Sequence, residues 1–290
     1  MNSIAENTLA KKPRRKKHRL LWLDIITVAS ALVIFVVPFY FMLINSLKNR
    51  VESNRLNLAW PTDGIFHFDN FLQVIQASRF MLLRGFYNSI VIAAGAVMVL
   101  IVICSLGGYI LQRLQSKFLA GVNALILTGL MLPPAILPTI WVMNFLGIYR
   151  TIFGMIMVQV ALHIPFCTML YRGYVAALPR ELEEAAYVDG CGSWYMFVRI
   201  IFPLMLPVTS TITILQFVAI FNDFVNPLYF LPGTRTPTVQ LTLYNFMSQF
   251  DASMNLVFAS VVLITIVPFV MFMFFNKKIV SGITAGAIKG

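Results

Sequence analysis

Long apolar runs dominate the 290-residue sequence and are separated by shorter polar stretches. Six runs contain the roughly 20 mainly apolar residues that a helix needs to cross a bilayer. They lie at about 21–43, 88–111, 121–146, 152–170, 204–228 and 256–275. Backbone groups within lipid must be hydrogen-bonded internally, so these runs predict helices. The strands of an outer-membrane barrel would alternate in polarity over about ten residues instead. We therefore predict an all-α membrane protein with six transmembrane helices.

Composition and charge support a membrane location. Hydrophobic residues make up 59% of the chain and charged residues 11%, with a mean hydropathy of +0.81. A soluble domain carries about 25% charged residues. The net charge of +11 would suggest nucleic acid for a soluble chain, but seven of the 22 basic residues lie at 11–19, directly before the first run. This cluster favours a cytoplasmic N-terminus over a lipid- or RNA-binding tail. For the chain as a whole we expect contact with membrane lipid and none with nucleic acid.

The distribution of basic residues also predicts the orientation. With the N-terminus inside, the segments 1–20, 112–120, 171–203 and 276–290 are cytoplasmic and hold fifteen of the 22 Lys and Arg residues. Both termini are therefore expected inside. We predict a basic N-terminus at 1–20, a six-helix domain at 21–275 and a cytoplasmic tail at 276–290. The first run is too long for a signal peptide and lacks a cleavage site, so it is expected to remain as an anchor.

The first outer loop, at about 45–87, is predicted to be folded. Trp60-Pro61 marks a turn, and a short amphipathic helix is expected to begin near Phe68,. Two interpretations stay open for this helix, and they are compatible with each other. It rests on the membrane surface, or it contacts an external partner.

The polar interruption at 171–203 holds three of the eleven acids within four residues. Pro179 suits a first helical turn, and three carboxylates follow where the helix dipole favours negative charge, namely Glu181, Glu183 and Glu184,. Asp189-Gly190 is a stop-and-turn signal, because glycine adopts positive φ without steric cost,. The pattern predicts a helix–turn–helix outside the membrane. Its shallow face allows another surface to come close and consists of Leu182, Ala185 and Ala186,.

Two segments match spaced patterns. Glu184-Ala185-Ala186, Gly190, Ile200 and Phe202-Pro203 resemble the EAA loop of ABC-importer permeases, EAA-x3-G-x9-I-x-LP, and depart from it only where Phe202 replaces Leu. The C-terminal segment resembles the G-x-T-x-G-x-x-K-G terminus of maltose-type permeases through Gly282, Thr284, Gly286, Lys289 and Gly290.

Polar residues within the apolar runs are candidates for a substrate pathway. Asn222, Asp223 and Asn226 lie late in the fifth run, with Asn222 and Asn226 spaced i, i+4 on one helical face. Such groups suit a polyhydroxylated ligand, although a helix end at the outer interface explains them equally well. The stretch resembles the N-D/E-x-x-x-P-L segment of carbohydrate-type permeases. His163 either lines the pathway or, the favoured interpretation, bonds a carbonyl freed near Pro165,. Pro133-Pro134 should kink the third helix,.

The sequence lacks the short motifs of several enzyme classes. The sequence contains no G-x-x-x-x-G-K-[ST], no HExxH and no G-x-S-x-G,. We therefore expect no catalytic residue, no metal site and no cofactor bound by this chain, and we interpret the three cysteines as unpaired. A stand-alone secondary transporter of a small polar solute is the alternative. It would need ion-coupling groups at membrane depth, whereas Asp24 and Asp223 both lie near predicted helix ends.

The resemblance implies the type I permease fold of a bacterial ABC importer for carbohydrates, in the inner membrane. The expected partners are a paralogous permease that completes a heterodimer, two ATPase subunits that bind ATP-Mg, and an extracytoplasmic solute-binding protein. ATPase coupling is expected from Glu181, Glu184, Ala185, Ala186, Asp189 and Gly190. The substrate pathway would include Asn222, Asp223, Asn226 and His163. The ATPase subunits would also contact the tail at Gly282, Thr284 and Lys289.

Overall fold

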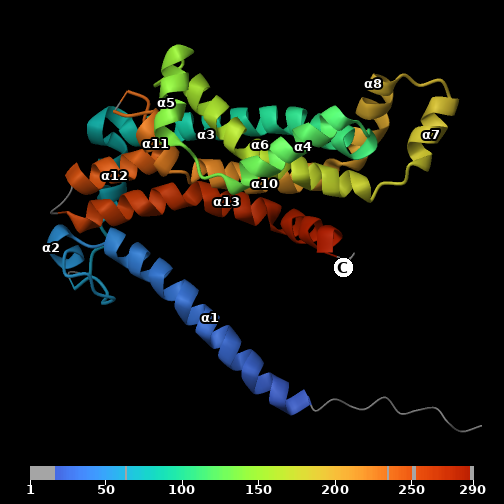
Figure 1. Cartoon of the computed structure of the whole chain (residues 1–290). Coiled ribbons are helices and arrows are strands. Elements are labelled where there is room, and N and C mark those ends of the chain that lie inside the picture. Colours follow the sequence, from blue (N-terminus) through green and yellow to red (C-terminus); the bar gives the residue numbers. More distant parts are fainter. Residues whose placement is uncertain (1–16, 63, 234, 250–252, 288–290) are drawn as a thin grey trace, which may run out of the picture.

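The computed structural model describes residues 17–62, 64–233, 235–249 and 253–287, and these residues form helices and connecting segments without a strand. Figure 1 shows an elongated bundle with α7 and α8 at one end and α2 and α12 at the other. We call these the α7 end and the α2 end. The helices are α1 Lys17–Ser46, α2 Arg50–Ser53, α3 Asp69–Arg113, α4 Lys117–Met131, α5 Ile136–Phe145, α6 Ile152–Ala176, α7 Glu181–Val188, α8 Ser193–Met196, η1 Phe197–Ile201, α9 Phe202–Leu204, α10 Leu206–Phe221, α11 Val225–Phe230, α12 Val239–Gln249 and α13 Met254–Ala287.

Three described helices are long and apolar enough to cross a membrane, namely Trp22–Ser46 within α1, α3 and α6. A fourth span results if Ser193–Leu204 and Leu206–Phe221, which meet at a bend of 70°, are taken together. Shorter apolar helices are Lys117–Met131, Ile136–Phe145 and Met254–Val270. An all-helical, multi-pass membrane protein is therefore confirmed, whereas the count of six spans stays a prediction.

The predicted boundaries are wrong at two runs. The run 121–146 is two helices, α4 and α5, because Pro133 and Pro134 cannot continue the hydrogen-bond ladder,. The run 204–228 is likewise divided, with α10 ending at Phe221 and α11 following. Within the predicted outer loop 45–87, a helix begins at Asp69, which agrees with the short helix expected to begin near Phe68. α3 is broken at 77–80, where three consecutive non-glycine residues have φ of 50–60°.

Helix α3 forms the centre of the bundle. It contacts α6, α10, α12 and α13, and Figure 1 shows it running along the whole bundle. Its buried side chains recur at the three- and four-residue spacing of one helical face and include Ile92, Ala93, Ala96, Leu100 and Cys104,. Small residues on this face let neighbouring backbones approach closely, which is how helices associate in membranes.

Gly108 continues this face at a close approach of α3 to α6. A Cβ atom there would lie 2.6 Å from the Cβ atom of Tyr171 and 2.9 Å from the backbone nitrogen of Arg172. We expect Gly108→Ala to lower the free energy of unfolding by about 1–3 kcal/mol, because the two helices must separate. Thermal unfolding in detergent micelles measures this. Gly107→Ala is the matched control, since the nearest atom there is Thr168 Cγ2 at 3.9 Å. Equal losses in both variants would contradict the steric explanation.

Hydrogen bonds among buried polar side chains hold the α2 end together. Lys48, which is 1% exposed, donates to Asn57 Oδ1 at 2.8 Å and to Asn45 Oδ1 at 3.3 Å. Burial lowers the pKa of Lys48,. Asn70 donates to the Lys48 carbonyl at 3.0 Å and accepts from Asn255 Nδ2 at 2.7 Å. These bonds connect the first outer loop to α3 and α13, so the loop is folded, as its turn residues predicted.

Helix α1 diverges from the rest of the bundle (Figure 1). It contacts α13 and α2, and most of its apolar side chains are exposed, among them Trp22, Ile26, Leu32 and Phe35. α1 begins and α13 ends toward the α7 end (Figure 1). The large apolar surface of α1 requires lipid or another subunit to cover it.

Candidate functional site

Helix α7 lies outside the bundle, between α6 and α8 (Figure 1). Its first turn carries Glu181, Glu183 and Glu184, where negative charge stabilises the positive end of the helix,. The helix ends at Val188, and Gly190 follows with a φ of 78°. Cys191 donates its backbone N–H to the Ala186 carbonyl at 2.9 Å, which closes the turn. The predicted helix and its glycine turn are therefore present.

One face of α7 is exposed and mixes acidic with apolar side chains. Glu184 and Ala185 are exposed, and Tyr187 and Val188 are 56% and 88% exposed. Exposed apolar side chains that cluster on a polar loop mark a surface for another protein. Ala186 was predicted to share this face, and that prediction is wrong. Ala186 is 3% exposed and packs into the core of its own chain, because it lies one position beyond Ala185 and so points about 100° away.

The inner face of α7 is fixed to α3 through Glu183. The Arg113 Nε atom donates to Glu183 Oε1 at 2.6 Å, and the Tyr109 hydroxyl donates to Oε2 at 3.1 Å. Arg113 also donates from Nη2 to the Leu178 carbonyl at 2.9 Å. Both charged side chains are almost completely buried, at 8% and 12% exposure. A buried pair with these additional hydrogen bonds holds α7 in one position, since breaking it would leave an unpaired charge.

Sequence reasoning did not select Glu183, although a signal was present. Glu183 and Ala186 are spaced i, i+3 and therefore share a helical face,. Both are buried in the structure. Because Ala186 is apolar, the face that it shares with Glu183 could have been predicted to point inward. A carboxylate buried on that face needs a cation as its partner.

The end of α3 also contacts the segment that leads into α10. The ring of Tyr109 packs on Phe197 with centroids 5.4 Å apart, and Phe197 packs on Trp194 and Phe202 at 6.2 Å each. Phe197 is buried. Tyr109 therefore touches α7 through its hydroxyl group and η1 through its ring. As a result, α7 is connected to the bundle through α3 as well as along the chain.

A second polar cluster surrounds Asp223, between α10 and α11. Its carboxylate accepts from Gln159 Nε2 at 2.5 Å, from Asn226 Nδ2 at 2.7 Å and from the Asn226 backbone N–H at 3.2 Å. The last bond satisfies the start of α11, as a capping side chain does. Gln159, on α6, is fully buried and was missed by sequence reasoning, although a glutamine within an apolar run was a visible signal.

The other predicted pathway residues lie apart from this carboxylate. Asn222 is exposed and accepts from Gln240 Nε2 at 3.2 Å, whereas Asn226 bonds to Asp223. The prediction that Asn222 and Asn226 share one helical face is wrong, because α10 ends at Phe221 and α11 begins at Val225. The His163 Nδ1 atom lies 2.8 Å from the Gln159 carbonyl of its own helix. Pro165 frees the carbonyl of Ala161 and not that of Gln159,, so the favoured interpretation of His163 stays a prediction.

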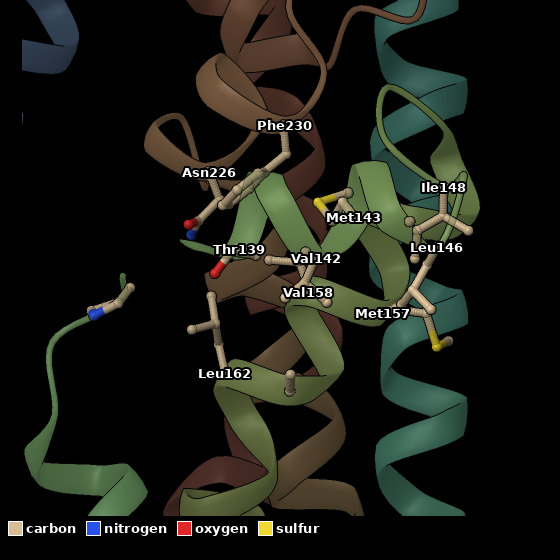
Figure 2. A pocket seen from close by; sticks show the side chains of 13 residues that line it. Thr139, Val142, Met143, Leu146, Ile148, Met157, Val158, Leu162, Asn226 and Phe230 are labelled. Carbon is tan, nitrogen blue, oxygen red and sulfur yellow. The ribbon is translucent and has the colours of Figure 1, made fainter. Parts of the chain in front are cut away.

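A cavity of about 200 Å³ lies between α5, α6 and α11. Its lining is mainly apolar, with Val142, Met143, Met157 and Phe230, and the polar side chains of Thr139 and Asn226 lie toward one side of it (Figure 2). Ligand pockets usually measure about 300–1,000 Å³. This cavity is therefore too small and too apolar for a polyhydroxylated ligand.

Some predictions fall outside what the structure describes. The backbone of α13 continues through Gly282 and Thr284 to Ala287, but the side chains of this part are not described, so the cytoplasmic tail at 276–290 stays a prediction. Lys289 lies outside the described residues, as do residues 1–16 of the basic N-terminus. Within the described ranges, no three His, Cys, Asp or Glu side chains gather as metal ligands would.

Comparison with known proteins places these features in context. The profile of a family described as "Binding-protein-dependent transport system inner membrane component" matches residues 105–284. The chain is 31% identical over 280 residues to the melibiose/raffinose/stachyose import permease protein MelC of Bacillus subtilis (strain 168). The aligned region covers 96% of this chain and 99% of MelC.

Solved structures share the fold. A crystal structure of a bacterial ABC transporter involved in the import of the acidic polysaccharide alginate matches with a TM-score of 0.78 and 18% identity, over 92% of this chain and 99% of that chain. A bacterial alginate ABC transporter in complex with an alginate pentasaccharide-bound periplasmic protein matches with a TM-score of 0.66 and 16% identity, over 90% and 94% of the two chains.

Proposed function

Because the chain belongs to the family of binding-protein-dependent transport system inner membrane components, we propose that it is the permease subunit of an ATP-driven importer for sugars or oligosaccharides. The main structural support for a permease subunit is that α7 has an exposed face and is fixed to the bundle by a buried ion pair. This face supplies a rigid contact for a subunit that provides energy. The permease itself is not an enzyme, and ATP hydrolysis belongs to separate subunits.

The proposed substrate class follows the relatives. MelC is a permease for melibiose, raffinose and stachyose, and the matching structures belong to an alginate importer. All of these substrates are oligosaccharides or polysaccharides. We propose neutral oligosaccharides for this chain, because two of its candidate pathway side chains, Asn222 and Asn226, are amides, which donate and accept hydrogen bonds without a charge,.

We further propose that the chain spans the inner membrane six times with the α7 end in the cytoplasm. Fifteen of 22 basic residues then lie inside, as the charge rule requires,. The broken helix α4–α5 counts as one span, and α13 as another. A paralogous permease would complete a heterodimer. The exposed apolar surface of α1 and the absence of buried side chains on α4 support an additional subunit.

The remaining partners are two ATPase subunits that bind ATP-Mg at the α7 end and a solute-binding protein at the α2 end. ATP binding would close the ATPase dimer and displace α7 through Glu184 and its exposed neighbours. The Glu183–Arg113 pair would then carry the displacement to α3, which packs against α6 and α10. Alternating access follows when the two conformations of the bundle differ in their contacts with the ATPase.

Reconstitution tests this function. The chain, its partner permease, the ATPase subunits and the binding protein are placed in proteoliposomes, and uptake of labelled raffinose or maltotetraose is measured. We expect uptake to require ATP, the binding protein and this chain, and to persist with a protonophore. Uptake driven by a proton or sodium gradient without ATP would instead establish the secondary transporter.

We propose a substrate-contact role for Asn222 and a structural role for Asp223. Asn222 is exposed and holds one bond to Gln240, so its amide is accessible, whereas both Asp223 oxygens have partners. Asn222→Ala should lower uptake roughly tenfold at low substrate concentration, as the loss of one or two sugar hydrogen bonds predicts. Asn144→Ala is the control, because that exposed amide bonds only to its own helix. Unchanged uptake by Asn222→Ala would exclude the contact.

A further inference from the structure

We propose that a basic pocket at the α7 end binds the phosphate group of an anionic phospholipid. The pocket has a volume of about 530 Å³ and lies between the end of α3, the loop that follows it, the first turns of α4, and Arg172 of α6. Lys117 and Arg172 supply its two cationic side chains. No carboxylate is found among its described lining residues, so the site has a net positive charge.

The guanidinium of Arg172 is held in place without losing its charge. Its Nε atom donates to Gln112 Oε1 at 3.1 Å, and Nη1 donates to Asn123 Oδ1. Both acceptors are neutral amide oxygens, which orient the guanidinium but do not neutralise it. A guanidinium has five N–H donors in a fixed plane, so donors remain for an anion. Planar donors of this kind match the oxygens of a phosphate.

The start of α4 adds to the positive potential. Ser116 caps this fifteen-residue helix by accepting from the Leu119 backbone N–H at 3.1 Å, and Lys117 is its first residue. Ser116 and Lys117 both line the pocket. The positive end of the α4 dipole therefore borders the same space as the two cationic side chains and favours an anion there.

The apolar wall of the pocket indicates that the phosphate belongs to a lipid. Leu111, Leu114 and Leu119 lie beside the cations, so one site presents charge and hydrocarbon together. The pocket lies where α3 ends at Arg113 and α4 begins. Since α3 is long and apolar enough to cross a membrane, its end would lie at the level of the lipid headgroups. Basic pockets between transmembrane helices bind anionic headgroups in this way. The proposal depends on the membrane location of the chain and not on its transport activity.

Native mass spectrometry of the full-length chain, released from bilayers of mixed composition, tests this site. We expect phosphatidylglycerol to be retained over phosphatidylcholine, and Arg172→Gln and Lys117→Gln each to lower that retention about fivefold, the effect of one cation at an anionic surface. Arg235→Gln is the control, since it removes one exposed cation elsewhere. In a second measurement, phosphatidylglycerol should raise the thermal unfolding temperature of the wild type more than that of Arg172→Gln.

Three results would overturn the proposal. Equal retention of the two lipids would exclude recognition of the anionic headgroup. Equal retention of phosphatidylglycerol by Arg172→Gln and Arg235→Gln would exclude this pocket, provided that both variants unfold at the wild-type temperature in phosphatidylcholine. Displacement of phosphatidylglycerol by millimolar inorganic phosphate would show that the pocket recognises free phosphate rather than a lipid.

Discussion

Replacing Glu184 by Lys should lower the stimulated ATPase rate of the assembled importer by roughly tenfold or more. This is the rate of ATP hydrolysis in the presence of substrate-loaded binding protein. Glu184 lies on the exposed face of α7, next to Ala185. A contact surface that accepts this carboxylate would meet a cation instead, and a mispaired charge at an interface costs about 2–5 kcal/mol. The reversal also removes a favourable interaction with the positive end of α7. The rate of ATP hydrolysis with and without loaded binding protein measures the effect.

Two additional measurements separate the explanations of such a loss. Membrane insertion, followed by the amount of chain in the membrane fraction, should be unchanged, since Glu184 has no described partner within its own chain that the change would break. Co-purification of the ATPase subunits distinguishes lost docking from lost coupling, and either result supports a contact at Glu184. Asp24→Lys is the control, because Asp24 is another exposed acid and lies in the first half of α1, away from the α2 end. Full stimulation in Glu184→Lys would remove this residue from the interface.

The sequence predicted the parts of the fold that depend on local chemistry. The helix α7 follows from its acidic first turn, and its end follows from Gly190, which needs the positive φ that the structure has. The first span, Trp22–Ser46, agrees with the predicted run 21–43, because hydrophobic length alone decides it,. The prolines near residue 133 predicted a distortion but not a complete break between α4 and α5.

The parts that depend on tertiary contacts were not predictable in this way. The break in α3 at 77–80 contains no glycine or proline, so no local signal marks it. The bond between Asp223 and Gln159 joins residues 64 positions apart. The same holds for Arg113 and Glu183, which are 70 positions apart. A periodic pattern predicts which face of a helix is buried, but it does not predict which distant side chain covers that face.

The Glu183–Arg113 pair is the second position at which a large effect is expected. Glu183→Gln should lower the number of sugar molecules transported per ATP hydrolysed by roughly tenfold, while the chain still assembles with its partners. Removing one charge from a buried pair leaves the other uncompensated, at a cost of about 3–5 kcal/mol. Arg113 would then no longer fix both Glu183 and the Leu178 carbonyl. As a result, α7 would move without displacing α3. Uptake and ATP hydrolysis, measured together in proteoliposomes, give this ratio.

A charge exchange separates a coupling role of the pair from a purely structural one. Arg113→Glu and Glu183→Arg should each uncouple transport, and the double variant should recover part of the ratio, since the ion pair forms again with its direction reversed. Tyr109→Phe is the conservative comparison. It removes one hydrogen bond to Glu183, worth about 0.5–1.5 kcal/mol, but keeps the ring that packs on Phe197. Two results would contradict the coupling role: a double variant that is no better coupled than either single variant, or a Glu183→Gln variant that transports as the wild type does. In either case, the displacement of α7 would reach the bundle along the chain through η1 and not through α3.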